Sequence, residues 1–174
     1  MRLLHESKLV AAVSGWLTPT SPAPLRSLRH TATVSALALL RGLVSAAGDE
    51  AKRLATTRKQ LKAAGKARGS SSTVRATKLK ATAVQQNKYV ARLEEHMLAI
   101  FESVFAHRYR DVAADIRRDV LDMFAPCIVE YPSLFLEDKF TKYMGWQMND
   151  ADARVRSCVL RALRSIYSRD ELLE

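Results

Sequence analysis

The feature that most constrains this chain is a short frame that occurs twice, with its two copies 39 residues apart. Asp111, four intervening residues and Ile116-Arg117 recur as Asp150, four intervening residues and Val155-Arg156. An apolar helical stripe follows each arginine, and another apolar helical stretch precedes each aspartate. A period near 40 with two helices per unit is typical of HEAT-type α-solenoid repeats. Because such units stack to bury their apolar faces and build a long binding surface, the frame favours a scaffold over an enzyme.

The apolar periodicity predicts an all-α fold, a HEAT-like α-solenoid of helical pairs. Residues 1–47 are expected to form a first pair, in which Leu28 and Arg29 repeat the frame imperfectly because Ala23 stands at the aspartate position. Residues 48–92 are expected to form a long basic antiparallel helical hairpin inserted between the repeats. This segment is called the arm below.

The arm is expected to end in a flexible tip at residues 65–72, which hold two glycines and three serines in eight positions. Residues 93–174 are expected to hold two further repeats, with 134–148 and 152–168 as the last helical pair. Pro126 predicts a kink or an early end in the helix before them. No polar capping repeat follows, which indicates a solenoid truncated at its C-terminus.

The charge of the chain is concentrated in the arm. Residues 51–90 contain eleven Lys or Arg and no acidic residue, while the whole chain has a net charge of +10. Such a stripe suits a phosphate backbone or another acidic surface, but it equally suits a solvated linker. Tyr89 is the only aromatic residue there, so stacking on bases is not indicated and any nucleic-acid binding would be sequence-independent. The same lysines also fit a nuclear import signal.

Catalysis, metal binding and membrane insertion find no motif in the sequence. The four histidines lack the spacing of zinc ligands, and no glycine-rich phosphate loop is present. His107 to Asp111 (HRYRD) is similar to the kinase catalytic loop only superficially. Cys127 and Cys158 are interpreted as small core residues in a reducing compartment. No apolar run approaches the ~20 residues of a membrane span, so we expect no enzyme, no cofactor and no membrane partner.

For two groups of residues the sequence alone leaves a structural and a binding role as alternatives. Trp146 near the end of a repeat helix is more often a core residue than part of a binding site. Tyr143 lies three residues earlier and therefore shares a helix face with Trp146. Arg108 and Arg110 could cap a helix C-terminus or contact phosphate together with the arm.

Several stretches in a fixed order carry a resemblance to a known family: VFAHRYRD at 104–111, ADIR at 114–117, Phe135, KYMGW at 142–146, Asp150 and Val155-Arg156. Together they resemble the stromalin conserved domain of the stromal-antigen subunits of cohesin. The match runs from about residue 25 to the end, and it is dense in 97–168 and weak in 48–90.

The resemblance implies a non-catalytic cohesin regulatory subunit, or a fragment of one, that acts in the nucleus on chromosomes in sister chromatid cohesion. Its implied partners are the cohesin ring with its kleisin subunit, DNA bound without sequence preference, and regulatory peptides with an aromatic anchor. The alternative is a generic HEAT-repeat adaptor whose basic segment is a mere linker.

Two sets of residues are predicted to bind. The DNA-binding set is Lys52, Arg53, Arg58, Lys59, Lys62, Lys66, Arg68, Arg75, Lys78, Lys80, Arg108 and Arg110. The peptide-binding set, which the resemblance implies, is Tyr109, Asp138, Lys142, Tyr143 and Trp146. The family's pocket includes an arginine beyond the matching region, so the pocket is expected to be incomplete in this chain.

Overall fold

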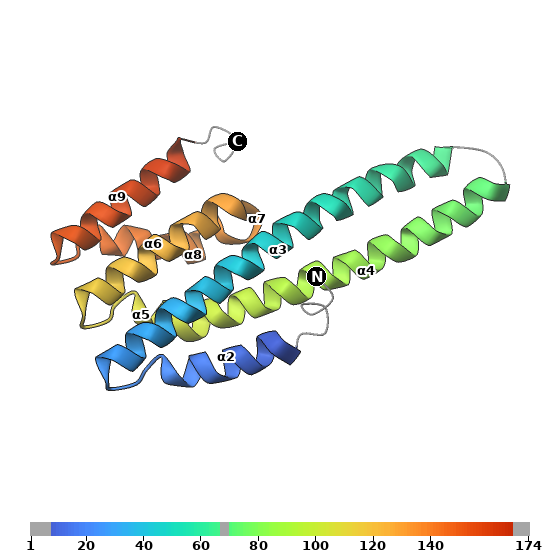
Figure 1. Cartoon of the computed structure of the whole chain (residues 1–174). Coiled ribbons are helices and arrows are strands. Elements are labelled where there is room, and N and C mark those ends of the chain that lie inside the picture. Colours follow the sequence, from blue (N-terminus) through green and yellow to red (C-terminus); the bar gives the residue numbers. More distant parts are fainter. Residues whose placement is uncertain (1–7, 67–69, 169–174) are drawn as a thin grey trace.

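The computed structural model describes residues 8–66 and 70–168 of the chain. Within these residues the regular structure is helical throughout, and no strand occurs (Figure 1). The helices are α2 (Lys8–Thr20), α3 (Arg26–Lys66), α4 (Ser70–Ile100), the π-helical turn η1 (Phe101–Phe105), α5 (Ala106–Arg108), α6 (Ala114–Glu130), α7 (Pro132–Phe135), α8 (Asp138–Gln147) and α9 (Ala153–Tyr167). The all-α prediction is confirmed.

The helices stack side by side in the order of a solenoid. Helix α3 contacts α2 on one side and α6 on the other, and α6 in turn contacts α9. One continuous core runs through these layers, built from Leu40 of α3, Met97 of α4, Phe124 of α6 and Val159 of α9, all fully buried. Because each layer buries its apolar stripe only against the next, the repeat pattern of the sequence becomes a stacked body.

Helices α3 and α4 run antiparallel and extend together beyond this body (Figure 1). Helix α3 has 41 residues, which corresponds to about 60 Å at the rise of an α-helix. Both helices are continuous through the positions where the sequence suggested borders, at 47–48 and 92–93. Of the expected tip at 65–72, residues 67–69 lie outside the described residues, and helix α4 already begins at Ser70.

Two expectations about helix limits need correction. Helix α6 contains Pro126 and still continues to Glu130, so the proline does not end it early. The segment 134–148 is not one helix, because α7 ends at Phe135 and α8 begins at Asp138. Phe135 and Phe140 are both buried and their rings pack 5.2 Å apart, so the break lets both rings enter the core.

Contrary to the expectation from the sequence, part of α3 is apolar enough in length and composition to cross a membrane. Nearly half of that window is buried inside the structure. Leu37, Leu40 and Leu43 belong to it and are fully buried against the other layers. The composition is therefore accounted for by a central core helix.

Candidate binding surfaces

The repeated Asp and Arg residues of the frame form a ladder between successive layers. Arg117 at the start of α6 donates two hydrogen bonds to the carboxylate of Asp150, at 2.6 and 2.7 Å. Its remaining nitrogen donates to the backbone carbonyl of Asp111, six residues earlier, at 2.7 Å. Arg117 thus binds the turn of its own repeat and the carboxylate of the following repeat, so its role is to stabilise the stacking of the two repeats.

Arg29 makes the same contacts one layer earlier. It donates to the Asp111 carboxylate at 2.9 and 3.4 Å and to the carbonyl of Ala23, again six residues earlier, at 2.9 Å. The first frame therefore works without its aspartate, because a backbone carbonyl does not depend on the side chain. Arg156 repeats the local half of the pattern, with a 2.7 Å bond to the carbonyl of Asp150.

These contacts keep two carboxylates ionised in a protected position. The hydrogen bond from Arg117 lowers the pKa of Asp150 below its ordinary value, against the opposing effect of burial. Burial raises the pKa of Asp111, but hydrogen bonds from the Ala113 N–H and from Arg29 outweigh it, and the net pKa is lowered. The charges of the ladder residues are thus already paired with one another within the fold.

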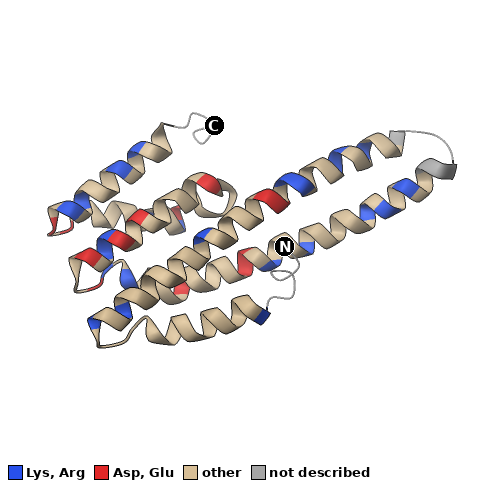
Figure 2. Ribbon diagram, viewed as in Figure 1, with Lys and Arg blue, Asp and Glu red and all other residues tan. Residues whose placement is uncertain are grey.

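The arm shows the opposite use of charge. Beyond the body its two helices carry Lys and Arg without acidic residues (Figure 2). Among the described residues, no arm lysine forms an ion pair with a carboxylate, whereas Arg53 pairs with Glu50 at 3.4 Å and Arg58 donates to Asn87 at 3.0 Å. The exposed basic residues described on the arm are Lys52, Arg53, Arg58, Lys59, Lys62, Arg75, Lys78, Lys80, Lys88 and Arg92.

The remaining members of the predicted DNA-binding set lie elsewhere. Arg68 is outside the described residues, and the side chain of Lys66 is not described. Arg108 and Arg110 lie at the opposite end of the molecule, near the start of α3. From Arg29, which shares a pocket with them, α3 runs 23 residues to Lys52, which is about 35 Å. Arg108 and Arg110 therefore do not form one patch with the arm.

Four residues of the predicted peptide-binding set come together on the body. The rings of Tyr143 and Trp146 lie 5.3 Å apart, and Tyr109 from the end of α5 lies 4.8 Å from Tyr143 and 6.1 Å from Trp146. The ammonium of Lys142 lies 5.3 Å from the centre of the Tyr143 ring and 5.5 Å from that of Trp146. We call these four residues the aromatic cluster. Trp146 is 55% exposed, so it is not a core residue.

Asp138 stands apart from this cluster. It is exposed at the first position of α8, eight residues before Trp146, which corresponds to about 12 Å along the helix. Helix α8 therefore carries a positive charge beside the rings and a negative charge near its other end.

A groove of about 290 Å³ adjoins the cluster between α8 and the segment that runs from the end of α4 through η1 to α5. Its floor is aromatic, with Phe101, Phe140 and Tyr143, and its rim holds Glu102 and Lys139. Phe101, Glu102, Lys139 and Phe140 are not among the binding residues predicted from the sequence. The spacing of Phe140 and Tyr143, three residues apart on one helix face, is the signal that could have indicated an extended aromatic strip.

The fold and its exposed surfaces thus define an α-solenoid scaffold with a basic arm and a surface aromatic cluster. Residues 1–82 match the STAG domain, and residues 110–174 match the Stromalin conservative domain. The "Sister-chromatid cohesion protein 3" of Arabidopsis thaliana is 36% identical over 156 residues, which is 90% of this chain and 14% of that protein. The "Cohesin subunit scc-3" of Caenorhabditis elegans is 33% identical over 175 residues, 99% of this chain and 16% of that protein.

A solved structure agrees with these matches. The "Cohesin subunit Scc3 from Z. rouxii, 88-1035" superposes with a TM-score of 0.85 at 28% identity, covering 92% of this chain and 18% of that chain. The chain belongs to the stromalin family of cohesin subunits. It spans about one seventh of the length of these relatives.

Proposed function

We propose that this chain is a scaffold region of a non-catalytic cohesin subunit that acts in sister chromatid cohesion on chromosomes in the nucleus. Family membership supports the complex, since the matched relatives are named as cohesin subunits. Within the complex its partners are the ring and its kleisin subunit, as the family resemblance implies. Two exposed surfaces give the region its own activities: the arm binds DNA, and the aromatic cluster docks peptides.

The observation that carries the DNA proposal is the lack of carboxylate partners for the arm lysines among the described residues. Lys52, Lys59 and Lys62 are separated by seven and then three residues, a spacing that places them on one face of α3. Arg75 and Lys78 share a face of α4 in the same way. Exposed cations with no internal partner are free to replace the counterions of a phosphate backbone, which binds without reading sequence.

A matched pair of double variants tests the arm. Lys59→Glu with Lys62→Glu reverses two exposed charges three residues apart on α3, and Arg161→Glu with Arg164→Glu does the same on α9 of the body. We expect the arm variant to weaken binding of a duplex of about 20 base pairs by more than 10-fold in a gel-shift titration, because each lost phosphate contact lowers the affinity. The α9 variant should bind within about 2-fold of the parent chain.

Equal loss in both variants would mean that net charge, not the arm, determines binding. No binding by the parent chain at low salt would favour the alternative, a HEAT-repeat adaptor with a solvated linker.

The peptide proposal rests on the exposed aromatic cluster. Rings of Tyr109, Tyr143 and Trp146 offer faces and edges to a further ring, which is the arrangement that aromatic pairs prefer. Lys142 over two of these rings places a positive charge at the rim, so an acidic residue beside the anchor would be favoured. The ligand is therefore an acidic segment with a Phe or Tyr anchor.

The chain offers a matched control for this site, because it has two exposed tryptophans. Trp146→Ala removes a ring of the cluster, whereas Trp16→Ala removes one that is 83% exposed on α2. We expect Trp146→Ala to weaken binding of an acidic peptide with one phenylalanine by at least 10-fold in fluorescence anisotropy, and Trp16→Ala to leave it unchanged. Circular dichroism should show equal helical content in both. If Trp146→Ala unfolds the chain, the ring has a structural role and the proposal fails.

A further inference from the structure

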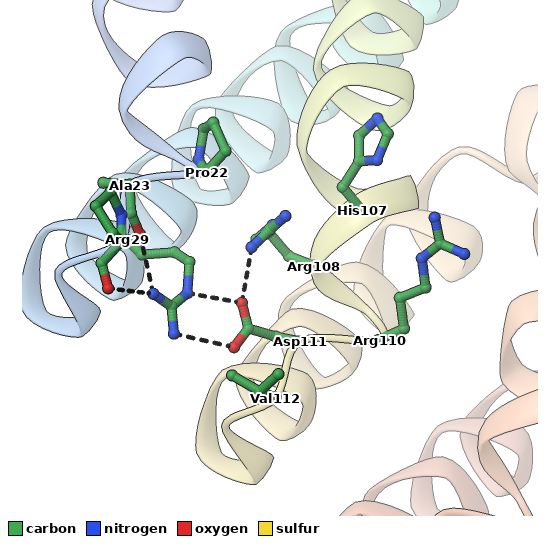
Figure 3. A pocket seen from close by; sticks show the side chains of 9 residues that line it. Pro22, Ala23, Arg29, His107, Arg108, Arg110, Asp111 and Val112 are labelled. Carbon is green, nitrogen blue, oxygen red and sulfur yellow. Dashed lines mark hydrogen bonds and ion pairs between the residues drawn. The ribbon is translucent and has the colours of Figure 1, made fainter.

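A second pocket lies at the repeat turns, at the end of the molecule opposite the arm. It has a volume of about 420 Å³ and lies between the Pro22–Pro24 turn before α3 and the connection from α5 to α6 (Figure 3). Its basic lining residues are His107, Arg108 and Arg110, and Asp111 and Arg29 form one wall. This pocket belongs neither to the arm nor to the aromatic cluster.

The charges in the pocket do not balance. The Asp111 carboxylate, 1% exposed, accepts hydrogen bonds from two guanidinium groups, those of Arg29 at 2.9 and 3.4 Å and of Arg108 at 2.8 Å (Figure 3). The carbonyls of Ala23 and Pro24 take the remaining bonds of Arg29, at 2.9 and 3.1 Å. Two positive charges thus share one negative charge, and one is left over.

This surplus resides on the Arg108 side of the pocket. Among the described residues, Arg108 donates only through Nη1, so the other nitrogens of its fork have no acceptor there. Arg110 is exposed, lines the same pocket and forms no ion pair within the described ranges. The hollow is therefore bordered by two uncompensated positive charges. One is on Arg108, which Asp111 fixes in place, and the other is on Arg110, whose guanidinium points away from Asp111 in Figure 3.

We propose that this pocket binds a phosphate monoester. Arginine forks match the oxygens of a phosphate with paired, charge-assisted hydrogen bonds. A phosphate monoester carries a charge near −2 at neutral pH, which equals the surplus, whereas a phosphodiester carries −1. A monoester group can enter a hollow end-on, while a duplex presents its phosphates on a broad convex surface. The ligand is a phosphorylated side chain of a partner or a free phosphate monoester.

The test uses the whole chain with phenyl phosphate and dimethyl phosphate as probes, titrated by isothermal calorimetry. Phenyl phosphate should bind, and dimethyl phosphate should bind at least 10-fold more weakly. Arg110→Gln should weaken phenyl phosphate binding at least 10-fold, because Arg110 is exposed and its loss leaves the Asp111 network in place. Arg164→Gln, which changes another exposed arginine on α9, is the control and should leave phenyl phosphate binding unchanged.

Two further measurements distinguish the possible sources of the phosphate group and separate this pocket from the arm. A phosphoserine peptide that binds more tightly than free O-phosphoserine identifies a modified protein as the ligand, and equal affinities identify a small phosphate monoester. Lys59→Glu with Lys62→Glu should leave phenyl phosphate binding unchanged, so failure of the arm proposal and of this one are distinguishable. Absence of binding, equal binding of the diester, or full binding by Arg110→Gln each overturns the proposal.

Discussion

The repeat body and the arm use the same residue types for different purposes. In the body, the side chains of Arg117 and Asp150 are only 15% and 5% exposed and form a bidentate pair that joins two layers. In the arm, Lys59 and Lys62 are exposed and form no ion pair among the described residues. The difference shows that a paired charge stabilises the fold, while an unpaired charge remains available to a ligand.

Packing separates the two regions in the same way. Phe105, Phe124 and Leu40 of the body are completely buried. Val74 and Val84 of the arm are 70% and 50% exposed, although they lie on one of the longest helices of the structure. The body is therefore stabilised by burial of apolar side chains, and the arm depends on helix propensity and on its attachment to the body.

The largest expected effect follows from this contrast in packing. Phe124→Ala should lower the free energy of unfolding by about 3–5 kcal/mol, because it removes a buried ring and leaves a cavity. Val84→Ala in the arm should lower it by less than about 0.5 kcal/mol, because the side chain is half exposed. Urea unfolding followed by circular dichroism measures both. Similar costs for the two would show that the arm is packed like the body.

The next effect concerns the ladder. Arg117→Met should destabilise the chain by about 2–4 kcal/mol, since it leaves Asp150 ionised, nearly buried and without its two charged donors. Arg161→Met, at an exposed position of α9, should cost less than about 0.5 kcal/mol. Equal values from urea unfolding of these two variants would mean that the ladder pair contributes nothing beyond a surface charge.

Acid should weaken the body through the same pairs. The folded-state pKa values of Asp111 and Asp150 lie below their ordinary value of 3.8, so their contribution is complete above pH 3.8 and is lost as the pH falls through the lowered values. Each unit of lowering contributes about 1.4 kcal/mol. Unfolding free energies at pH 5 and pH 3 should therefore differ less in Asp150→Asn than in the parent chain. The same difference in both would remove Asp150 from the explanation.

The smallest expected effect is on the arm itself. Lys59→Glu with Lys62→Glu should change the free energy of unfolding by less than about 0.5 kcal/mol, because neither lysine has a carboxylate partner in the described structure. Thermal unfolding of this variant and the parent chain measures the change. A loss of several kcal/mol would show that these lysines stabilise the fold.

The sequence predicted the parts of this structure that depend on period and local pairing. The two copies of the Asp and Arg frame predicted stacked helical pairs, and in the structure Arg117 of one copy donates to Asp150 of the other. The all-α fold followed from apolar spacing alone. These features are local or repeat at a fixed interval, so a single amino-acid sequence is enough to predict them.

The parts that the sequence could not predict depend on contacts between distant segments. Periodicity could not place Trp146 outside the core, since exposure depends on how α8 lies against η1 and α5. Nor could it show that Arg108 shares Asp111 with Arg29, 79 positions earlier in the chain. The borders of the arm were predicted at the positions where the composition changes. The Ala- and Lys-rich sequence of the arm has a high helix propensity, like the sequence of the body, so α3 and α4 continue through these borders.

The salt dependence of duplex DNA affinity tests the central contrast most directly. The logarithm of the binding constant should fall linearly with the logarithm of salt concentration, with a slope near −5 for about six phosphate contacts. Lys59→Glu with Lys62→Glu should make this slope less steep by about 2, while Arg161→Glu with Arg164→Glu should leave it unchanged. If the slope is the same in all three proteins, the unpaired charges of the arm are not what binds the phosphate backbone.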